Sequence, residues 1–315
     1  MRKMRHILYS LLAASLMTAC TQDEHTGGSL PEGRVPMVLN AGGLQVTATP
    51  DTRGIFDGDW SDVTQIAVTE TSTDEGKKTY TVTPAADYST AELVPEDEAN
   101  TIWWNYNNEE KDIIAWHPVD KKMPQVGGSW MVTADQRDGI PVDEDLLYAS
   151  GQVTLQNPYL TFRHLLSKVV INICQSDYLQ NYSPTDVEVT MDNIRLDGKL
   201  ELGIYEELIL NNDGGTGTIV HPHRCDQAAS GYFATYEALV MPQTVTMDNK
   251  NIIIQVDDVQ YVWEISLQTI VNNSFDSGCQ YTFNITVDAK GLEVSVAQST
   301  TWTDGNSGSG SVVLP

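Results

Sequence analysis

The fold class is decided near the end of the chain, where residues 281–296 read YTFNITVDAKGLEVSV. Apolar residues occupy every second position on both sides of the letters DAKG. A period of two is typical of a β-strand with one buried face. The letters AKG fit a three-residue hairpin loop that ends on a left-handed glycine. The stretch therefore predicts two antiparallel strands.

The same period of two recurs along most of the chain. Residues 252–256 read IIIQV and residues 259–265 read VQYVWEI, with Asp257 and Asp258 between them, which predicts a second tight hairpin. The candidate helix of note, residues 161–168, can equally begin a strand. We therefore predict an all-β chain.

The length predicts two domains, because about 295 residues remain after an export signal and one sandwich needs far fewer. A proline follows the strand-like residues 153–155, so we place the boundary near Asn157 and Pro158. We expect two tandem β-sandwich domains, at residues 35–158 and 159–315.

Residues 1–19 predict an export signal. Three basic residues lie among residues 1–6, and the apolar run of residues 7–17 is shorter than the ~20 residues of a membrane-spanning helix. Residues 16–20 read LMTAC, which resembles a lipobox, in which the signal peptidase cuts before Cys20 and acyl chains attach to it. Lipid would then hold the protein to the outer membrane. A secretory signal without lipidation is the alternative.

The composition argues against nucleic acid as a partner and limits the number of disulfides. Loss of residues 1–19 removes three basic residues and no acidic ones, so the net charge of −25 becomes −28. Such a polyanion repels nucleic acid, and we expect no binding to DNA or RNA. Residues 20–34 are polar and glycine-rich, which favours a flexible tether. Cys174, Cys225 and Cys279 allow at most one disulfide, and the sequence leaves its formation open.

No motif for catalysis is present. The chain lacks HExxH, a P-loop, GxSxG and a dinucleotide-binding glycine pattern, so we expect no enzyme, no catalytic residue and no cofactor. Residues 221–225 read HPHRC, which we interpret as a polar loop and not as a zinc site. Residues 57–59 read DGD and residues 143–145 read DED, and we expect solvated acidic loops and no metal ligands there.

Two further candidates have ordinary structural explanations. We expect His164 to be a buried, hydrogen-bonded structural histidine and Trp116 to lie in the core. For Trp103 and Trp104 the sequence leaves both a core position and a sugar-stacking platform open.

Several short motifs together resemble the fimbrillin family of Bacteroidales. They are DQ at residues 135–136, DLLYA at 145–149, FRHLLSKVVINI at 162–173, LVMPQ at 239–243 and GCQYTFNI at 278–285. The resemblance covers most of the chain after the signal. It implies two transthyretin-like β-sandwich domains and a structural or accessory (stalk or tip) subunit of a cell-surface fimbrium.

The resemblance also implies how subunits join. Fimbrillin precursors reach the surface as lipoproteins, and a protease with arginine specificity cuts after the first strand. That strand leaves, and a strand of a neighbouring subunit fills the groove by donor strand exchange, in which main-chain hydrogen bonds supply the affinity. The partners implied are other fimbrial subunits, the protease and a host or bacterial surface ligand.

The residues here accommodate this scheme. The exchanged first strand would include Val38, Leu39, Leu44, Val46 and Ala48, and a turn-like segment with an arginine follows it.

That arginine, Arg53, is the cleavage candidate; a permanent surface loop is the alternative for it. Arg34 is the rival cleavage position, but a cut there would remove only the tether. The alternative function is a monomeric surface lipoprotein that binds a glycan or a host protein. Only residues 311–315 follow the glycine- and serine-rich tail as a donor segment.

Overall fold

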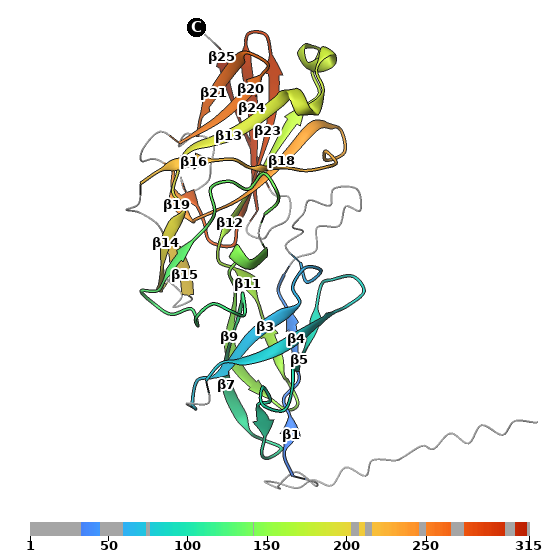
Figure 1. Ribbon diagram of the computed structural model, residues 1–315, viewed down its shortest axis with the longest axis vertical. Helices are drawn as coiled ribbons and strands as arrows, with labels where there is room; N and C mark the ends of the chain where they lie inside the picture. Colours follow the sequence, from blue (N-terminus) through green and yellow to red (C-terminus); the bar gives the residue numbers. More distant parts are fainter. Residues whose placement is uncertain are drawn as a thin grey trace, which may run out of the picture.

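The computed structural model describes residues 33–44, 59–73, 76–140, 142–202, 208–211, 216–245, 250–265, 274–299 and 306–313. Within these ranges the chain is all-β, as predicted, and its helical turns are the short 3₁₀ segments η1 (Val142–Glu144), η2 (Tyr178–Asn181) and η3 (Pro184–Asp186). No helix in the described part of the chain is long and apolar enough to cross a membrane. The molecule is elongated, with two lobes stacked along its long axis (Figure 1).

The first lobe is built on one eight-stranded sheet and a small strand pair. In spatial order the sheet contains β10 (Tyr159–Thr161), β2 (Leu39–Gly42), β5 (Ala91–Pro95), β4 (Lys78–Pro84), β3 (Gln65–Glu70), β7 (Glu110–His117), β9 (Leu147–Thr154) and β11 (Arg163–His164). The pair consists of β1 (Val35–Pro36) and β6 (Trp103–Trp104).

One short segment closes this sheet on itself. Residues 159–161 form β10 at one end of the strand order, and residues 163–164 form β11 at the other end. Because only Phe162 separates them, the segment joins β2 on one side and β9 on the other. The core inside contains Leu160 and the edge-to-face pair Trp60 and Phe162, with ring centroids 5.1 Å apart.

The second lobe is a sandwich of two main sheets. The larger contains β17 (His223–Arg224), β18 (Tyr232–Val240), β12 (Ser167–Cys174), β23 (Gln280–Asp288), β24 (Gly291–Ser299) and β25 (Asn306–Val313). The smaller contains β16 (Thr218–Val220), β13 (Val187–Ile194), β20 (Asn251–Val256) and β21 (Val259–Glu264). Accessory sheets are β15 (Leu208–Asn211), β14 (Asp197–Leu202) and β8 (Ser129–Met131), and β19 (Gln243–Thr244) with β22 (Ser274–Phe275).

Both predicted hairpins are present. In β20 and β21, Val256 pairs with Val259 across Asp257 and Asp258. In β23 and β24, Asp288 pairs with Gly291, so the turn contains two residues and not the three that were predicted. The glycine has φ +154° and already belongs to the ladder, which explains the shorter loop. The candidate helix at residues 161–168 is not helical, because β11 and the start of β12 occupy it.

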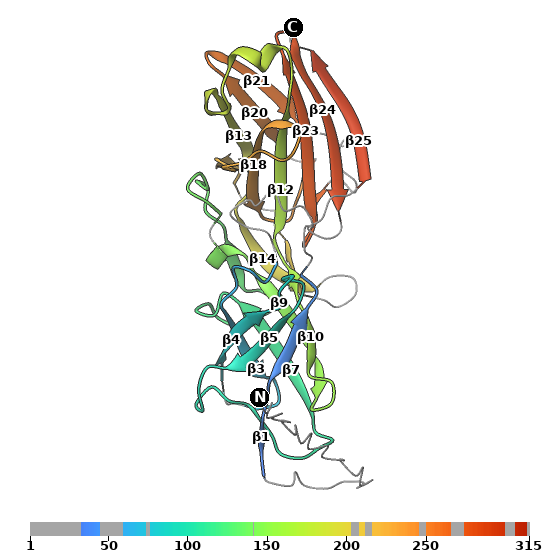
Figure 2. The ribbon, with the colours of Figure 1, turned by 90° about the vertical axis from the view of Figure 1, so that its right-hand side faces the viewer.

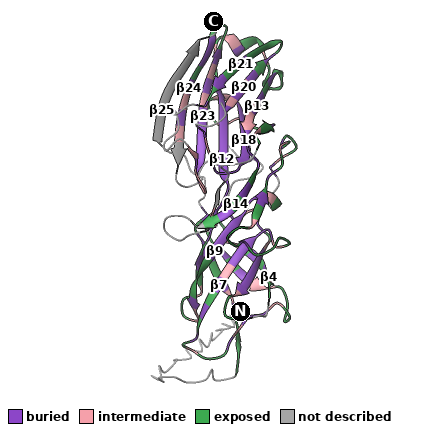
Figure 3. Cartoon of the chain, turned by 90° about the vertical axis from the view of Figure 1, so that its left-hand side faces the viewer, coloured by how far each residue is buried: buried purple, intermediate pink, exposed green. Residues whose placement is uncertain are grey.

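The described residues form two hydrophobic cores, as the chain length predicts, and buried positions run along the strands of both lobes (Figure 3). The first sheet continues past the predicted boundary at Pro158, because β10 and β11 pair with β2 and β9. An earlier segment, which includes Trp130 and Leu146, packs into the core of the second lobe. The chain therefore crosses between the lobes more than once.

The end of the described chain is the last strand of the larger sheet. Strand β25 pairs with β24 over residues 306–313, so the glycine- and serine-rich tail is part of a ladder. No disulfide joins Cys174, Cys225 and Cys279.

Candidate functional site

The resemblance directs attention to β2, the first strand of the eight-stranded sheet in chain order, which lies between two other strands. It pairs antiparallel with β5, with Leu39 opposite Leu93 and Ala41 opposite Ala91. It pairs in parallel with β10, with Asn40 opposite Tyr159 and Gly42 opposite Thr161. We call the space between β5 and β10 the β2 slot; Figure 2 shows β2 in blue beside β10.

Main-chain hydrogen bonds hold β2 along its whole length. The Asn40 N–H donates to the Pro158 carbonyl over 2.7 Å, and the Phe162 N–H donates to the Gly42 carbonyl over 2.8 Å. Ahead of the strand, the Met37 N–H donates to the Ile102 carbonyl over 2.8 Å. Removal of the strand would leave donors and acceptors unpaired on both neighbouring strands, which makes the slot a template for another strand.

The side chains of β2 and its flanks fill the first core. Met37, Leu39, Ala41 and Leu44 are all buried. Leu39 and Ala41 point to the same face because they occupy alternate positions of β2. Val38, in contrast, is only half-buried. The strand ends at Gly42, so Leu44 lies just beyond the ladder and still contributes to the core.

Several predicted site residues lie outside the described residues. These are Cys20, Val46, Ala48 and Arg53. The rival arginine, Arg34, is described: its guanidinium carbon lies 4.8 Å from the centroid of the Trp103 ring, a cation–π contact. Strand β1 follows Arg34 directly and pairs with β6. Of the two tryptophans left open by the sequence, Trp104 lies in the first core, and the half-buried Trp103 stacks against Arg34.

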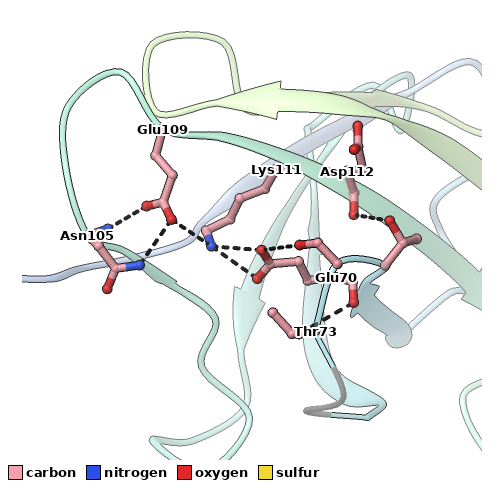
Figure 4. A network of polar contacts seen from close by, with 8 residues as sticks. Glu70, Thr73, Asn105, Glu109, Lys111 and Asp112 are labelled. Atoms are coloured by element: carbon pink, nitrogen blue, oxygen red, sulfur yellow. Dashed lines mark hydrogen bonds and ion pairs between the residues drawn. The ribbon is translucent and has the colours of Figure 1, made fainter.

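A buried ion cluster secures the same end of the first lobe (Figure 4). The Lys111 ammonium lies 3.0 Å from carboxylate oxygens of both Glu70 and Glu109, and its side chain is 6% exposed. The Asn105 backbone N–H and side-chain amide both donate to Glu109. The cluster thus connects the loop after β6 to β3 and β7.

The charges in this cluster stabilise one another. Burial alone would raise the pKa of Glu109, but the hydrogen bonds from Asn105 and Lys111 reverse this and leave its pKa lowered. Burial alone would lower the pKa of Lys111, and the bonds to Glu109 and Glu70 leave its pKa raised. A lysine held protonated in this way is not a nucleophile, so the cluster is structural.

The other candidate residues from the sequence have structural roles. His164 is a buried structural histidine, as predicted, and its Nδ1 lies 2.7 Å from Asp145 Oδ2. The prediction of a solvated loop is wrong for Asp145, which is 1% exposed because it pairs with this histidine. It is also wrong for Asp59, which is buried and accepts from the Ser61 N–H. Trp116 lies buried, as predicted.

Metal binding has no support in the described ranges, where no three His, Cys, Asp or Glu side chains gather closely enough to hold an ion. In the HPHRC segment, His223 and Arg224 form strand β17 instead of the polar loop that was predicted.

Sequence reasoning missed the parallel partner β10 and the glycines that meet it. Gly42 and Gly43 stand beside Tyr159 and Phe162. The only signal was a pair of glycines inside an apolar stretch, which can mark a close approach between backbones.

Comparisons with known proteins agree with this architecture. The fimbrillin-like family model matches residues 52–302. No curated protein matches the chain. A crystal structure of a candidate cell adhesion protein from Bacteroides uniformis is similar, with 18% identity, a TM-score of 0.59, and coverage of 84% of this chain and 97% of that one. A second, from Bacteroides ovatus, has 15% identity, a TM-score of 0.53, and coverage of 89% and 98%.

At these identities the solved structures show a shared fold, whereas the family model spans most of the sequence. The chain belongs to the fimbrillin-like family, which is structural and not enzymatic, and so to the proteins of cell-surface fimbriae.

Proposed function

We propose that this chain is a structural or accessory subunit of a fimbrium, stalk or tip, that it is exported as a lipoprotein through Cys20, and that it joins its neighbours by strand exchange at the β2 slot. The observation that supports the proposal is the position of β2, which lies between two strands and carries side chains of the first core. No other strand of that sheet comes so early in the chain.

The energetics favour a long-lived joint. Met37, Leu39 and Leu44 are large, fully or almost fully buried side chains. At ~1.5 to 3 kcal/mol each, their removal would uncover roughly 5 to 9 kcal/mol of burial, an upper estimate because unfolded chains already bury some surface. A strand of a neighbouring subunit with the same alternation would recover most of this, together with the main-chain hydrogen bonds, without a covalent bond.

Cleavage after Arg53 is the proposed trigger. Arg53→Ala should leave export intact but block both maturation and the SDS-resistant ladders that an arginine-specific protease produces from the wild-type chain. Arg34→Ala is the matched control and should assemble normally, because a cut at Arg34 does not release β2. If N-terminal sequencing showed that the subunits of assembled fibres begin at Cys20, the result would contradict the proposal.

Lipid anchoring is tested separately. Cys20→Ala should abolish acyl labelling and surface display, since the thiol is the attachment point in proteins with such a signal. A variant that is displayed and labelled like the wild type would show that Cys20 is not the attachment point of the lipid.

A second candidate, a monomeric lipoprotein that binds a glycan, is favoured by one surface hollow. A cavity of about 420 Å³ lies between η1, β8 and the loop before β8, and Trp130, Leu200, Met123 and Met131 line it. Met131 is 73% exposed. If the cleaved protein stays monomeric and retains glycans on an array in a Trp130-dependent manner, this second function is the correct one.

A further inference from the structure

The end of β2 meets its parallel neighbour at a place where side chains have no room. At Gly42, an added Cβ would overlap the Tyr159 hydroxyl and lie 2.9 Å from the ring carbon that carries it. At Gly43, an added Cβ would overlap the Phe162 carbonyl oxygen and lie 2.7 Å from the Thr161 methyl group. Both glycines therefore allow β2 and the segment after it to approach residues 159–162 closely.

Gly43 has a second constraint, which is conformational. Its φ is +91°, in the region that residues with a Cβ rarely adopt. This turn ends the ladder at Gly42, after the Phe162 N–H has bonded to the Gly42 carbonyl, and it returns Leu44 to the core. The glycine thus fixes where the strand stops and in which register it lies.

The two glycines face obstacles of different kinds. Tyr159 is a side chain, 44% exposed, whose ring can rotate away from the strand. The Phe162 carbonyl belongs to the backbone between β10 and β11, and Phe162 itself is packed against Trp60 in the core. The obstacle at Gly42 can therefore move aside, whereas the obstacle at Gly43 can move only together with the backbone.

We propose that the β2 slot selects its occupant, and accepts from a neighbouring subunit only a strand that has alternating apolar residues followed by a glycine in the register of Gly43. The inference rests on the proposed function, in which such a strand replaces β2. The Phe162 carbonyl is the specificity-determining group, because it belongs to the backbone and cannot move aside as the Tyr159 side chain can.

The experiment uses the mature chain, cleaved by an arginine-specific protease, and synthetic peptides of residues 37–49. The peptides are wild type, Gly42→Ala, Gly43→Ala and the matched control Asn40→Ala, whose side chain is exposed. Each is titrated against the wild-type protein and against a Tyr159→Ala protein, with Kd measured from a fluorescent label and the melting temperature as a second readout.

The wild-type and Asn40→Ala peptides should bind both proteins and raise their melting temperatures. The Gly43→Ala peptide should bind both proteins about 10-fold more weakly, a change of about 1.4 kcal/mol, because an L-residue disfavours this conformation and its Cβ would overlap the Phe162 carbonyl. The Gly42→Ala peptide should bind both proteins more tightly than the Gly43→Ala peptide does, because the exposed Tyr159 ring can move aside.

Equal affinities for all four peptides would overturn the selection by glycines while leaving strand exchange in place. A wild-type peptide that does not bind at all would instead overturn the exchange itself. A parallel comparison in the uncleaved chain needs no exchange. There Gly43→Ala should lower the melting temperature more than Gly42→Ala, and equal losses would refute the role of the Phe162 carbonyl.

Discussion

At the scale of single residues, the Lys111 cluster shows how a strongly acidic chain tolerates a buried charge. Two carboxylates surround the ammonium at 3.0 Å, and Asn105 satisfies the remaining acceptor positions of Glu109. Breaking such a cluster costs more than the cluster contributes, because the surviving charge stays buried without its partner.

The cluster makes the stability of the first lobe depend on pH. The folded-state pKa of Glu109 is lowered from its ordinary value of 4.5, so the unfolded chain takes up the proton first. Its contribution to the free energy of unfolding is therefore present above pH 4.5 and is lost as pH falls through the folded-state pKa. Glu109→Gln should lower the free energy of unfolding at neutral pH by about 1 to 3 kcal/mol.

Urea titrations at several pH values check this expectation. The difference between Glu109→Gln and the wild type should shrink at acidic pH, whereas the exposed neighbour variant Glu110→Gln should follow the wild type throughout. A Glu109→Gln difference that stays constant from neutral to acidic pH would contradict it.

At the scale of the element, β2 divides into a buried and an exposed face. Leu39→Ala removes a fully buried side chain and should lower the free energy of unfolding by about 2 to 5 kcal/mol. Asn40→Ala, one position away on the exposed face, should change it by less than about 0.5 kcal/mol. Identical urea midpoints for the two variants would mean that β2 does not occupy the slot.

Elements with local pairing could be read from the sequence, and elements with distant pairing could not. The β20–β21 and β23–β24 hairpins follow from alternation and turn residues, because the partners are close in the chain. The pairing of β2 with β10 joins residues about 120 positions apart, and nothing in either stretch specifies the other. The burial of Lys111 and Asp145 was equally invisible, since each depends on partners that only the fold supplies.

The candidate site was predictable in part for the same reason. The apolar positions around Leu39 marked the strand, but the glycine pair after Ala41 gave no indication of which backbone it meets. Strand β2 ends at Gly42, because the positive φ of Gly43 interrupts the ladder, and the later predicted strand residues Val46 and Ala48 lie outside the described residues.

At the scale of the whole molecule, two segments that pass from one lobe to the other are joined by a hydrogen bond. Asp145 precedes Leu146 of the second core and Leu147 of the first. His164 lies between Phe162 of the first core and Leu165 of the second. The hydrogen bond between Asp145 and His164 therefore sits where both cores end.

Removal of this bond should weaken both lobes together. His164→Ala leaves the Asp145 carboxylate buried without its partner and should cost about 2 kcal/mol or more. Calorimetry should show a lower melting temperature, whereas Arg137→Ala, which removes an exposed ion pair with Asp135, should leave it unchanged. Equal melting temperatures for the two variants would show that the junction carries no stability.

The direction of the strands in the second lobe has a mechanical consequence. Strands β12, β23 and β24 run nearly along the long axis (Figure 2), and β12 pairs with β23 in parallel from Lys168 to Ile173. Tension along that axis pulls such strands past one another, so their hydrogen bonds bear the load simultaneously in shear. Pulling across the sheet would break the same bonds one at a time, as a zipper opens. A filament in which the subunits were stacked along this axis would therefore have its greatest tensile strength along its own length.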